Sequence, residues 1–121
     1  MPFAQGLAVR VLTSEGALSG RRSLVDAVID LARREGLAGV TVTRAMVGYS
    51  PYGGMRTANW ADVGDDLPLT IEIVDLRERI EASLPQLVML VGDGALTVGE
   101  VRLYVPESKT ASSAGSSVGW E

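Results

Sequence analysis

The residues best suited to chemistry in this chain are a glycine pair and the arginine that follows it. Gly53 and Gly54 precede Met55 and Arg56, so successive backbone N–H groups could form a concave nest beside a guanidinium. A phosphate or carboxylate fits a site of that kind. A plain turn with a surface arginine has the same pattern, because short glycine-rich motifs recur by chance.

The turn Gly92-Asp93-Gly94 is a second candidate, because glycine adopts backbone conformations that other residues avoid. It follows an apolar helical pattern, so a helix C-cap and turn is its simplest interpretation. Arg21 and Arg22 stand just before a predicted helix start, where an anion could use free N–H groups. Arginines at such positions are also commonly just solvated.

Three aromatic residues, Tyr49, Tyr52 and Trp60, fall within one short segment of a chain that is only 5% aromatic. Their rings could stack on a base or on a partner protein. They could equally fix this segment to the body of the domain. The sequence leaves both interpretations open.

The residue types that are missing exclude whole classes of chemistry. The chain has no His and no Cys, so it lacks the commonest general base, the thiolate nucleophile and the usual transition-metal ligands. Its single lysine, Lys109, lies in a polar tail, which argues against Schiff-base and P-loop chemistry. We therefore expect a protein that is not an enzyme, with no catalytic residues and no metal site.

Charge and hydropathy limit the partners. The formal net charge is −4, and no run of arginines forms the basic stripe that a phosphate backbone requires, so nucleic acid is not an expected partner. No apolar stretch has the length that spans a bilayer, and residues 1–12 lack the pattern of a signal peptide. We expect a cytoplasmic protein without direct membrane insertion.

Hydrophobic periodicity predicts the elements that position these residues. Alternation over residues 7–12 predicts a strand, and Ser23 with Asp26 marks the start of a helix that ends near Gly36. Asp75 with Glu78 marks a second helix start, and Pro85 should kink or restart that helix. The other predicted elements are strands at 40–47, 67–74 and 101–105, a long loop or extended hairpin at 49–66, and a Ser/Gly-rich tail at 106–121.

This βαββαβ order predicts one ferredoxin-like α+β domain at residues 1–105, with two helices on one face of a four-stranded antiparallel sheet. Residue parity predicts that Arg10, Glu72 and Arg102 form a charge ladder on the other face. Ala8, Leu12, Val74 and Tyr104 should share that face. The face is apolar enough for a subunit interface, although antiparallel sheets also leave one face solvated.

Several segments together resemble a family of unknown function related to the PII signalling proteins. They are residues 24–42 (LVDAVIDLARREGLAGVTV), Gly48-Tyr49, Asp66-Leu67-Pro68 and residues 71–80 (IEIVDLRERI). The resemblance covers residues 6–105 and is carried by these segments as a set, in this order. It implies a homotrimer whose sheets face inward, with ligand sites in the clefts between subunits.

The resemblance also implies roles for two segments. The segment 49–66 corresponds to the loop through which PII proteins signal, and Gly92-Asp93-Gly94 to the turn that cradles adenine-nucleotide phosphates. PII proteins follow this turn with a phosphate-binding lysine, whereas Ala95 stands here. With the glycine pair and arginine above, the candidate ligand residues are Gly48, Tyr49, Gly53, Gly54, Arg56, Gly92, Asp93 and Gly94.

Three hypotheses for function follow. In the leading one, a small anionic ligand such as an adenine nucleotide binds between subunits and orders the segment 49–66, which contacts a partner such as a membrane transport protein. An acylphosphatase-like phosphate hydrolase shares the element order, and Arg21 or Arg22 with Asn59 would then position water. A structural subunit without a ligand is the third.

Overall fold

A computed structural model describes residues 2–50, 54–57 and 67–106 of the chain. Its main elements follow the predicted βαββαβ order, with two short hairpins added between them. In chain order they are β1 (Phe3–Ser14), β2 (Leu18–Ser19), β3 (Arg22–Ser23), α1 (Leu24–Arg34), β4 (Val40–Arg44), β5 (Val47–Ser50), β6 (Gly54–Thr57), β7 (Pro68–Leu76), α2 (Arg77–Val91) and β8 (Ala95–Tyr104).

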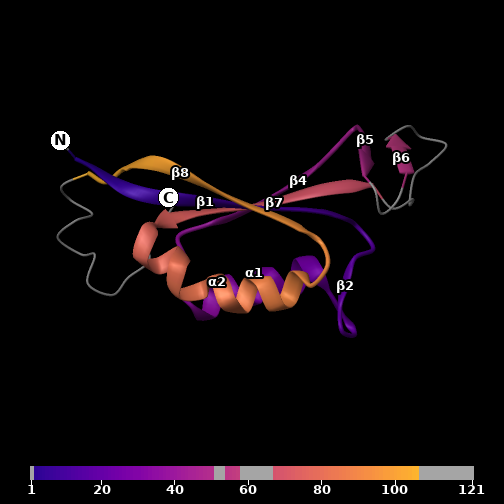
Figure 1. The fold of residues 1–121 in the computed structure, drawn as a ribbon, viewed down its shortest axis with the longest axis horizontal. Coiled ribbons are helices and arrows are strands. Elements are labelled where there is room, and N and C mark those ends of the chain that lie inside the picture. Colours follow the sequence, from indigo (N-terminus) through magenta and orange to yellow (C-terminus); the bar gives the residue numbers. More distant parts are fainter. Residues whose placement is uncertain (1, 51–53, 58–66, 107–121) are drawn as a thin grey trace.

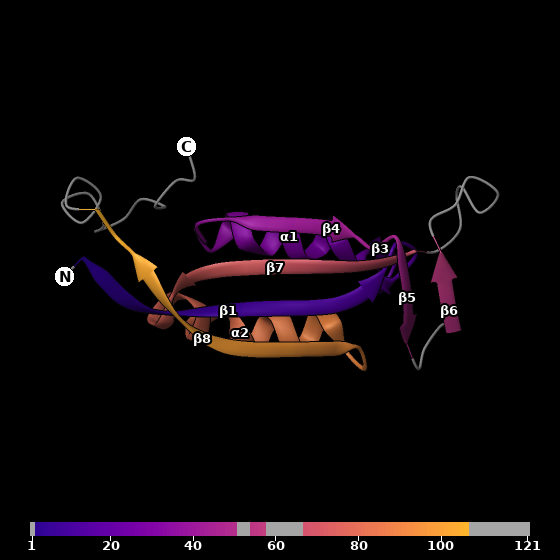
Figure 2. The ribbon, with the colours of Figure 1, turned by 90° about the horizontal axis from the view of Figure 1, so that it is seen from above.

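The main sheet has four antiparallel strands in the order β4-β7-β1-β8. Both helices lie on one face of this sheet (Figure 1). From above, α1 lies under β4 and β7, whereas α2 lies under β1 and β8 (Figure 2). The predicted ferredoxin-like fold is therefore confirmed.

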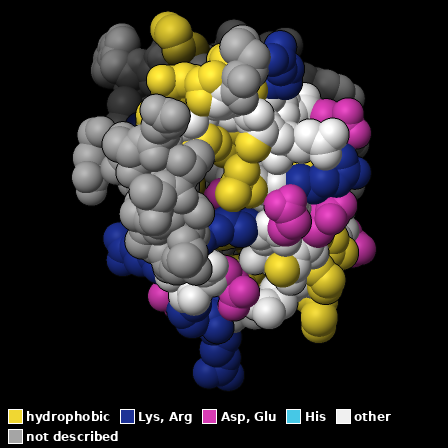
Figure 3. All heavy atoms as spheres, turned by 90° about the vertical axis from the view of Figure 1, so that its left-hand side faces the viewer, with side chains coloured by type: hydrophobic (Ala, Val, Ile, Leu, Met, Phe, Trp, Pro, Cys, Tyr) yellow, Lys and Arg dark blue, Asp and Glu magenta, His cyan; other side chains and the backbone are white. Residues whose placement is uncertain are grey.

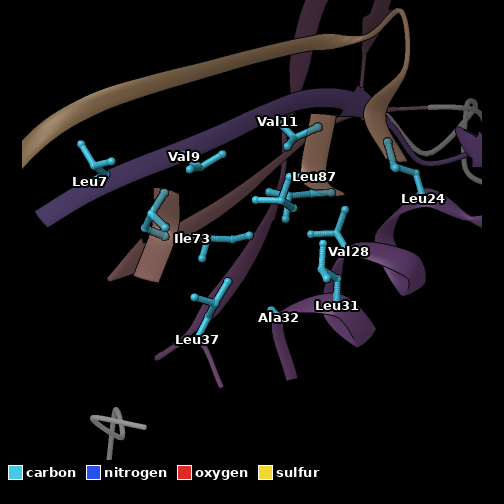
Figure 4. Close-up of a cluster of buried hydrophobic side chains, with 12 residues drawn as sticks. Leu7, Val9, Val11, Leu24, Val28, Leu31, Ala32, Leu37, Ile73 and Leu87 are labelled. Carbon is cyan, nitrogen blue, oxygen red and sulfur yellow. The ribbon is translucent and has the colours of Figure 1, made fainter. Parts of the chain in front are cut away.

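The core forms between the inner sheet face and the helices. Alternate residues of β1 and β7 point toward the helices, and Val9, Val11, Ile71 and Ile73 have no exposed surface. Figure 4 shows side chains of β1 opposite those of α1 and α2. The helices contribute Leu24, Val28, Leu31, Ala32, Ile80 and Leu87 to this cluster. Each fully buried side chain of this size contributes about 1.5–3 kcal/mol, which explains why so few aromatic rings suffice.

The first helix begins and ends as the sequence predicts. The side chain of Ser23 caps α1 by accepting a hydrogen bond from the backbone N–H of Asp26 at 3.3 Å. Gly36 follows the C-cap with a φ of 69°, a left-handed conformation that glycine adopts without strain. Its N–H donates to the carbonyl of Arg33, which closes the helix.

The second helix begins differently from the prediction. Leu76, not Asp75, is its N-cap, and no side chain caps it. Asp75 occupies an inward position of β7 and is fully buried, since odd-numbered residues of that strand face the core. The predicted capping arrangement is therefore wrong, because the strand continues one residue past Asp75. The helix also continues through Pro85 without restarting.

Asp75 instead ties the start of α2 to the connection between α1 and β4. Its Oδ2 accepts a hydrogen bond from the backbone N–H of Ala38 at 2.8 Å, and its Oδ1 accepts one from Leu76 at 2.6 Å. The Arg79 guanidinium lies 3.6 Å from the same carboxylate and donates to the carbonyl of Gly36 at 2.7 Å. This buried carboxylate therefore fixes both helices relative to the sheet.

The last strand is twice as long as predicted: β8 has 10 residues and starts directly after the turn. Its first half lies at the sheet edge and is largely exposed, so it lacks the apolar alternation that reveals a half-buried strand. The predicted strand at 40–47 is also divided, because β4 ends at Arg44 and β5 begins at Val47.

Candidate functional site

The β5–β6 hairpin holds the first group of predicted ligand residues. In its backbone register Gly48 pairs with Arg56, Tyr49 with Met55, and Ser50 with Gly54. The structure therefore brings Gly48 and Arg56 together across two strands, although they are distant in the linear pattern. Gly53, Tyr52, Trp60 and Asn59 lie outside the described residues, so the nest at Gly53-Gly54 stays a prediction.

The chain leaves the main sheet after Arg44 and returns to it at Leu67, and Glu15 contacts both residues. Its N–H donates to the carbonyl of Leu67 at 2.9 Å, and its Oε1 accepts from the N–H of Leu67 at 3.3 Å. Its carboxylate also pairs with the guanidinium of Arg44, the last residue of β4. We call Glu15, Arg44 and Leu67 the neck of the hairpin segment. Sequence reasoning missed the neck.

The turn Gly92-Asp93-Gly94 has a structural explanation for both glycines. Gly92 ends α2 with a φ of 64°, and its N–H donates to the carbonyl of Val88 at 3.0 Å. A Cβ on Gly94 would lie 3.0 Å from Cγ1 of Val91, and the Gly94 N–H donates to the Val91 carbonyl at 3.1 Å. Two amides of the turn thus bond to α2, and a role in phosphate binding stays a prediction.

These groups share one end of the sheet. Both ribbon views place the β5–β6 hairpin, the β2–β3 hairpin and the start of β8 at the end away from the N-terminus (Figures 1 and 2). Arg22 lies at this end and pairs with Asp30 of α1 at 3.4 Å, so its guanidinium already has a carboxylate partner. The predicted ligand residues that are described therefore gather in one region.

The predicted charge ladder on the other sheet face is correct for one pair only. Arg10 and Glu72 are cross-strand partners, and their Nε and Oε2 atoms lie 2.8 Å apart. Arg102 instead pairs in register with Gln5, and Tyr104 with Phe3. Odd-numbered positions of β1 face the helices, so Arg102 and Tyr104 have helix-facing parity and do not join the Arg10–Glu72 pair.

Arg102 and Tyr104 form an exposed cluster near the N-terminus. The guanidinium of Arg102 lies 4.8 Å from the ring centre of Phe3, and the rings of Phe3 and Tyr104 meet edge to face at 5.5 Å. Nearby, Arg77 pairs with Glu81 at 3.2 Å and with Glu100 at 3.7 Å. Figure 3 views this end and shows Arg and acidic side chains side by side among the described residues.

Two shallow cavities accompany strands β1 and β8. One, of about 290 Å³, lies between Gln5, Arg77 and Arg102. The other, of about 310 Å³, is lined in part by Ala8, Arg10, Thr97 and Gly99. Within the described part of the chain, no group of three or more acidic side chains could hold a metal ion, and no helix is long and apolar enough to cross a membrane.

Comparison with known proteins identifies the family. The sequence matches the DUF190 family, described as an uncharacterized ACR, over residues 6–103. The chain belongs to this family. A UPF0166 protein of Aquifex aeolicus (strain VF5) is 29% identical over 79 residues, which are 65% of this chain and 75% of that protein. A UPF0166 protein of Methanocaldococcus jannaschii is 29% identical over 82 residues, 67% of this chain and 75% of that protein.

Solved structures with the same fold are PII-like. CPII of Thiomonas intermedia K12, a nitrogen regulatory PII-like protein, was solved with ADP, AMP and acetate, and matches with a TM-score of 0.58 and 14% identity over 85% of this chain and 92% of that one. A putative PII-like signaling protein from Thermus thermophilus matches with a TM-score of 0.55 and 17% identity over 91% and 98% of the two chains. The predicted membership of a family of unknown function is thereby confirmed, and PII-like proteins share the fold of this chain.

Proposed function

We propose that this protein is a cytoplasmic PII-like regulatory protein that works by binding rather than by catalysis. It assembles as a homotrimer, binds a small anionic ligand in the clefts between subunits, and signals through residues 49–66 to a partner protein. The observation that carries this proposal is the shared fold, because the same architecture in CPII has been solved with ADP, AMP and bicarbonate. An adenine nucleotide is therefore the first ligand to test.

The hairpin supports this assignment. Its backbone register sets Arg56 opposite Gly48, a residue without a side chain. A guanidinium is a strong partner for an anion. The neck holds both ends of the segment, since Glu15 bonds to Leu67 and pairs with Arg44. A ligand at the hairpin can then alter residues 49–66 while the main sheet stays intact.

The proposal divides the chain into a PII-like domain at residues 1–105 and a tail at 106–121. Arg56 and the glycine pair 53–54 supply the anion contacts, and Gly92-Asp93-Gly94 forms a neighbouring wall of the same cleft. The partner is a regulated protein, with a membrane transport protein as the first kind to test. Catalysis has less support, since Arg22 of the alternative hydrolase site is paired with Asp30.

A ligand screen on the native oligomer tests this function. Size-exclusion chromatography with light scattering should give the mass of a trimer, and thermal shift should then be measured with AMP, ADP, ATP, bicarbonate, acetate and phosphate. A ligand that binds only the folded state at a hundred times its Kd adds about 2.7 kcal/mol of stability. An oligomer that no compound stabilises would favour the structural subunit, and turnover of an acyl phosphate would favour the hydrolase.

A further inference from the structure

The sheet face without helices carries a hollow and an exposed leucine. We call it the outer sheet face; it consists of the even-numbered residues of β1 and their cross-strand partners. Three successive rows cross it: Val74–Ala8–Gly99, Glu72–Arg10–Thr97 and Thr70–Leu12–Ala95. In Figure 1 neither helix covers this face.

Nothing among the described residues requires glycine at position 99. Its φ is not positive, so the backbone does not require glycine there. A Cβ on Gly99 would meet nothing within 4 Å, whereas a Cβ on Gly6 would lie 3.0 Å from the carbonyl of Asp75. Glycine weakens a strand and often marks a place where another chain or a ligand approaches closely. The glycine therefore leaves open space over the strand at this position, into which a side chain could enter.

A hollow lies at the same place. The cavity of about 310 Å³ is lined by Gly99, Ala8, Thr97 and Val101 among others, with Arg10 at its side. Two of these residues have small or absent side chains, which creates the depression in the row Val74–Ala8–Gly99. Its volume is sufficient for one branched apolar side chain.

The matching protrusion is Leu12. It is 47% exposed and lies two rows from Gly99 on the same face. The other exposed large apolar residues of the main sheet, among those whose burial is described, have helix-facing parity; they are Phe3, Val42, Val98 and Tyr104. Leu12 is thus the one large apolar side chain that this part of the sheet presents outward with nearly half its surface free.

We infer that Leu12 of one copy of this chain inserts into the hollow over Gly99 of a second copy. In a homotrimer this contact is head-to-tail, with Leu12 of each copy against the hollow of the next, and three such contacts close the ring. The inference rests on the homotrimer of the proposed function and names the residues that would hold it together.

Charge favours a second copy over a small ligand as the occupant. Arg10, which lines the hollow, and Glu72 carry opposite charges in adjacent positions of the outer sheet face. A small anion or cation would meet both signs here. A second copy presents the same pair and can align each charge with its opposite.

Two substitutions test the contact from its two sides. Gly99→Val fills the hollow without a clash inside the subunit and adds a β-branched residue that strands favour. Leu12→Ser removes the protrusion. The matched control is Leu18→Ser, because Leu18 is also an exposed leucine, at 66%, but lies in β2 outside the main sheet. Gly99→Ala gives a smaller intermediate step.

We expect Gly99→Val and Leu12→Ser each to raise the midpoint concentration for dissociation at least tenfold, with Gly99→Ala between them and the wild type and Leu18→Ser unchanged. Sedimentation velocity over a dilution series measures the midpoint, and circular dichroism shows that the dissociated subunits stay folded. Combining Gly99→Val with Leu12→Ser should add little, because both remove one contact.

Three results would overturn this inference in distinguishable ways. A wild type that is monomeric at micromolar concentration removes the proposed homotrimer and the contact with it. A stable oligomer that tolerates both substitutions leaves the homotrimer standing but shows that its contact lies elsewhere. Loss of ligand binding in Gly99→Val with an unchanged oligomer would assign the hollow to a small ligand instead.

Discussion

Replacing Asp75 with alanine should be among the most destabilising single changes in this protein. The carboxylate has no exposed surface and accepts hydrogen bonds from the N–H groups of Ala38 and Leu76. Removing it leaves both donors without that acceptor, and a hydrogen bond to a charged group contributes about 1.5–3 kcal/mol. The change also separates Arg79 from its carboxylate partner.

The expected loss in the free energy of unfolding is about 3–5 kcal/mol, the range for breaking a buried ion pair by removing one partner. Arg79 moderates this loss, since its side chain is 24% exposed and keeps its bond to the carbonyl of Gly36. Asp75→Asn should lose less, because the amide oxygen can still accept one of the two backbone bonds. Such a loss is a large part of the roughly 5–15 kcal/mol that typically stabilises a domain.

Urea unfolding followed by circular dichroism measures these changes, at a fixed protein concentration because oligomers gain stability by mass action. Glu81→Ala is the matched control. It also removes a carboxylate near the start of α2, but the Glu81 side chain is half exposed and pairs with Arg77 at 3.2 Å. That control should lose less than about 1 kcal/mol, as exposed pairs do. If Asp75→Ala and Glu81→Ala lose the same free energy of unfolding, the bonds of Asp75 do not stabilise the positions of the two helices.

Three further predictions concern the hairpin segment. Arg56→Ala should weaken the binding of an anionic ligand about 10- to 100-fold by calorimetry, with an unchanged melting temperature, because a charge-assisted hydrogen bond contributes about 1.5–3 kcal/mol; equal affinities would show that Arg56 is a surface residue. Glu15→Ala should speed hydrogen exchange at the Leu67 amide, because that amide donates to the lost carboxylate, and the control Arg22→Ala should leave the exchange rate unchanged. Equal exchange rates in both variants would show that Glu15 does not hold Leu67 in place. In a Trp120→Phe background, Trp60 emission should shift and its iodide quenching should fall when ligand binds, and a quenching constant that ignores saturating ligand would rule out ordering of this segment.

Local sequence patterns predicted those parts of the fold that short-range chemistry decides. The Ser23–Asp26 cap was correct, since a helix start depends on residues three positions apart. The same pattern at Asp75 and Glu78 was misleading, because Asp75 lies at an inward position of β7 and bonds to Ala38, 37 residues away along the chain. The sequence alone does not show whether a carboxylate before a helix will cap that helix or bind a donor elsewhere in the tertiary structure.

The candidate sites show the same division. Parity along one strand was reliable, so Arg10 and Glu72 were correctly placed on one face. To compare faces between two strands, one must know which residues are paired. The pairing of β8 could not be inferred because its exposed first half was not recognised as a strand. Arg102 and Tyr104 were therefore assigned to the wrong face. The neck was invisible because Glu15 meets Leu67 across 52 residues of sequence.

Calorimetric titration of ADP into the native oligomer, repeated with AMP and with bicarbonate present, tests the central claim most directly. If the protein is a PII-like regulator with sites between subunits, the titration should saturate at one nucleotide per chain, and dilution below the dissociation midpoint should abolish the heat of binding. An oligomer of the expected mass that gives no heat with any nucleotide or small anion would contradict the account.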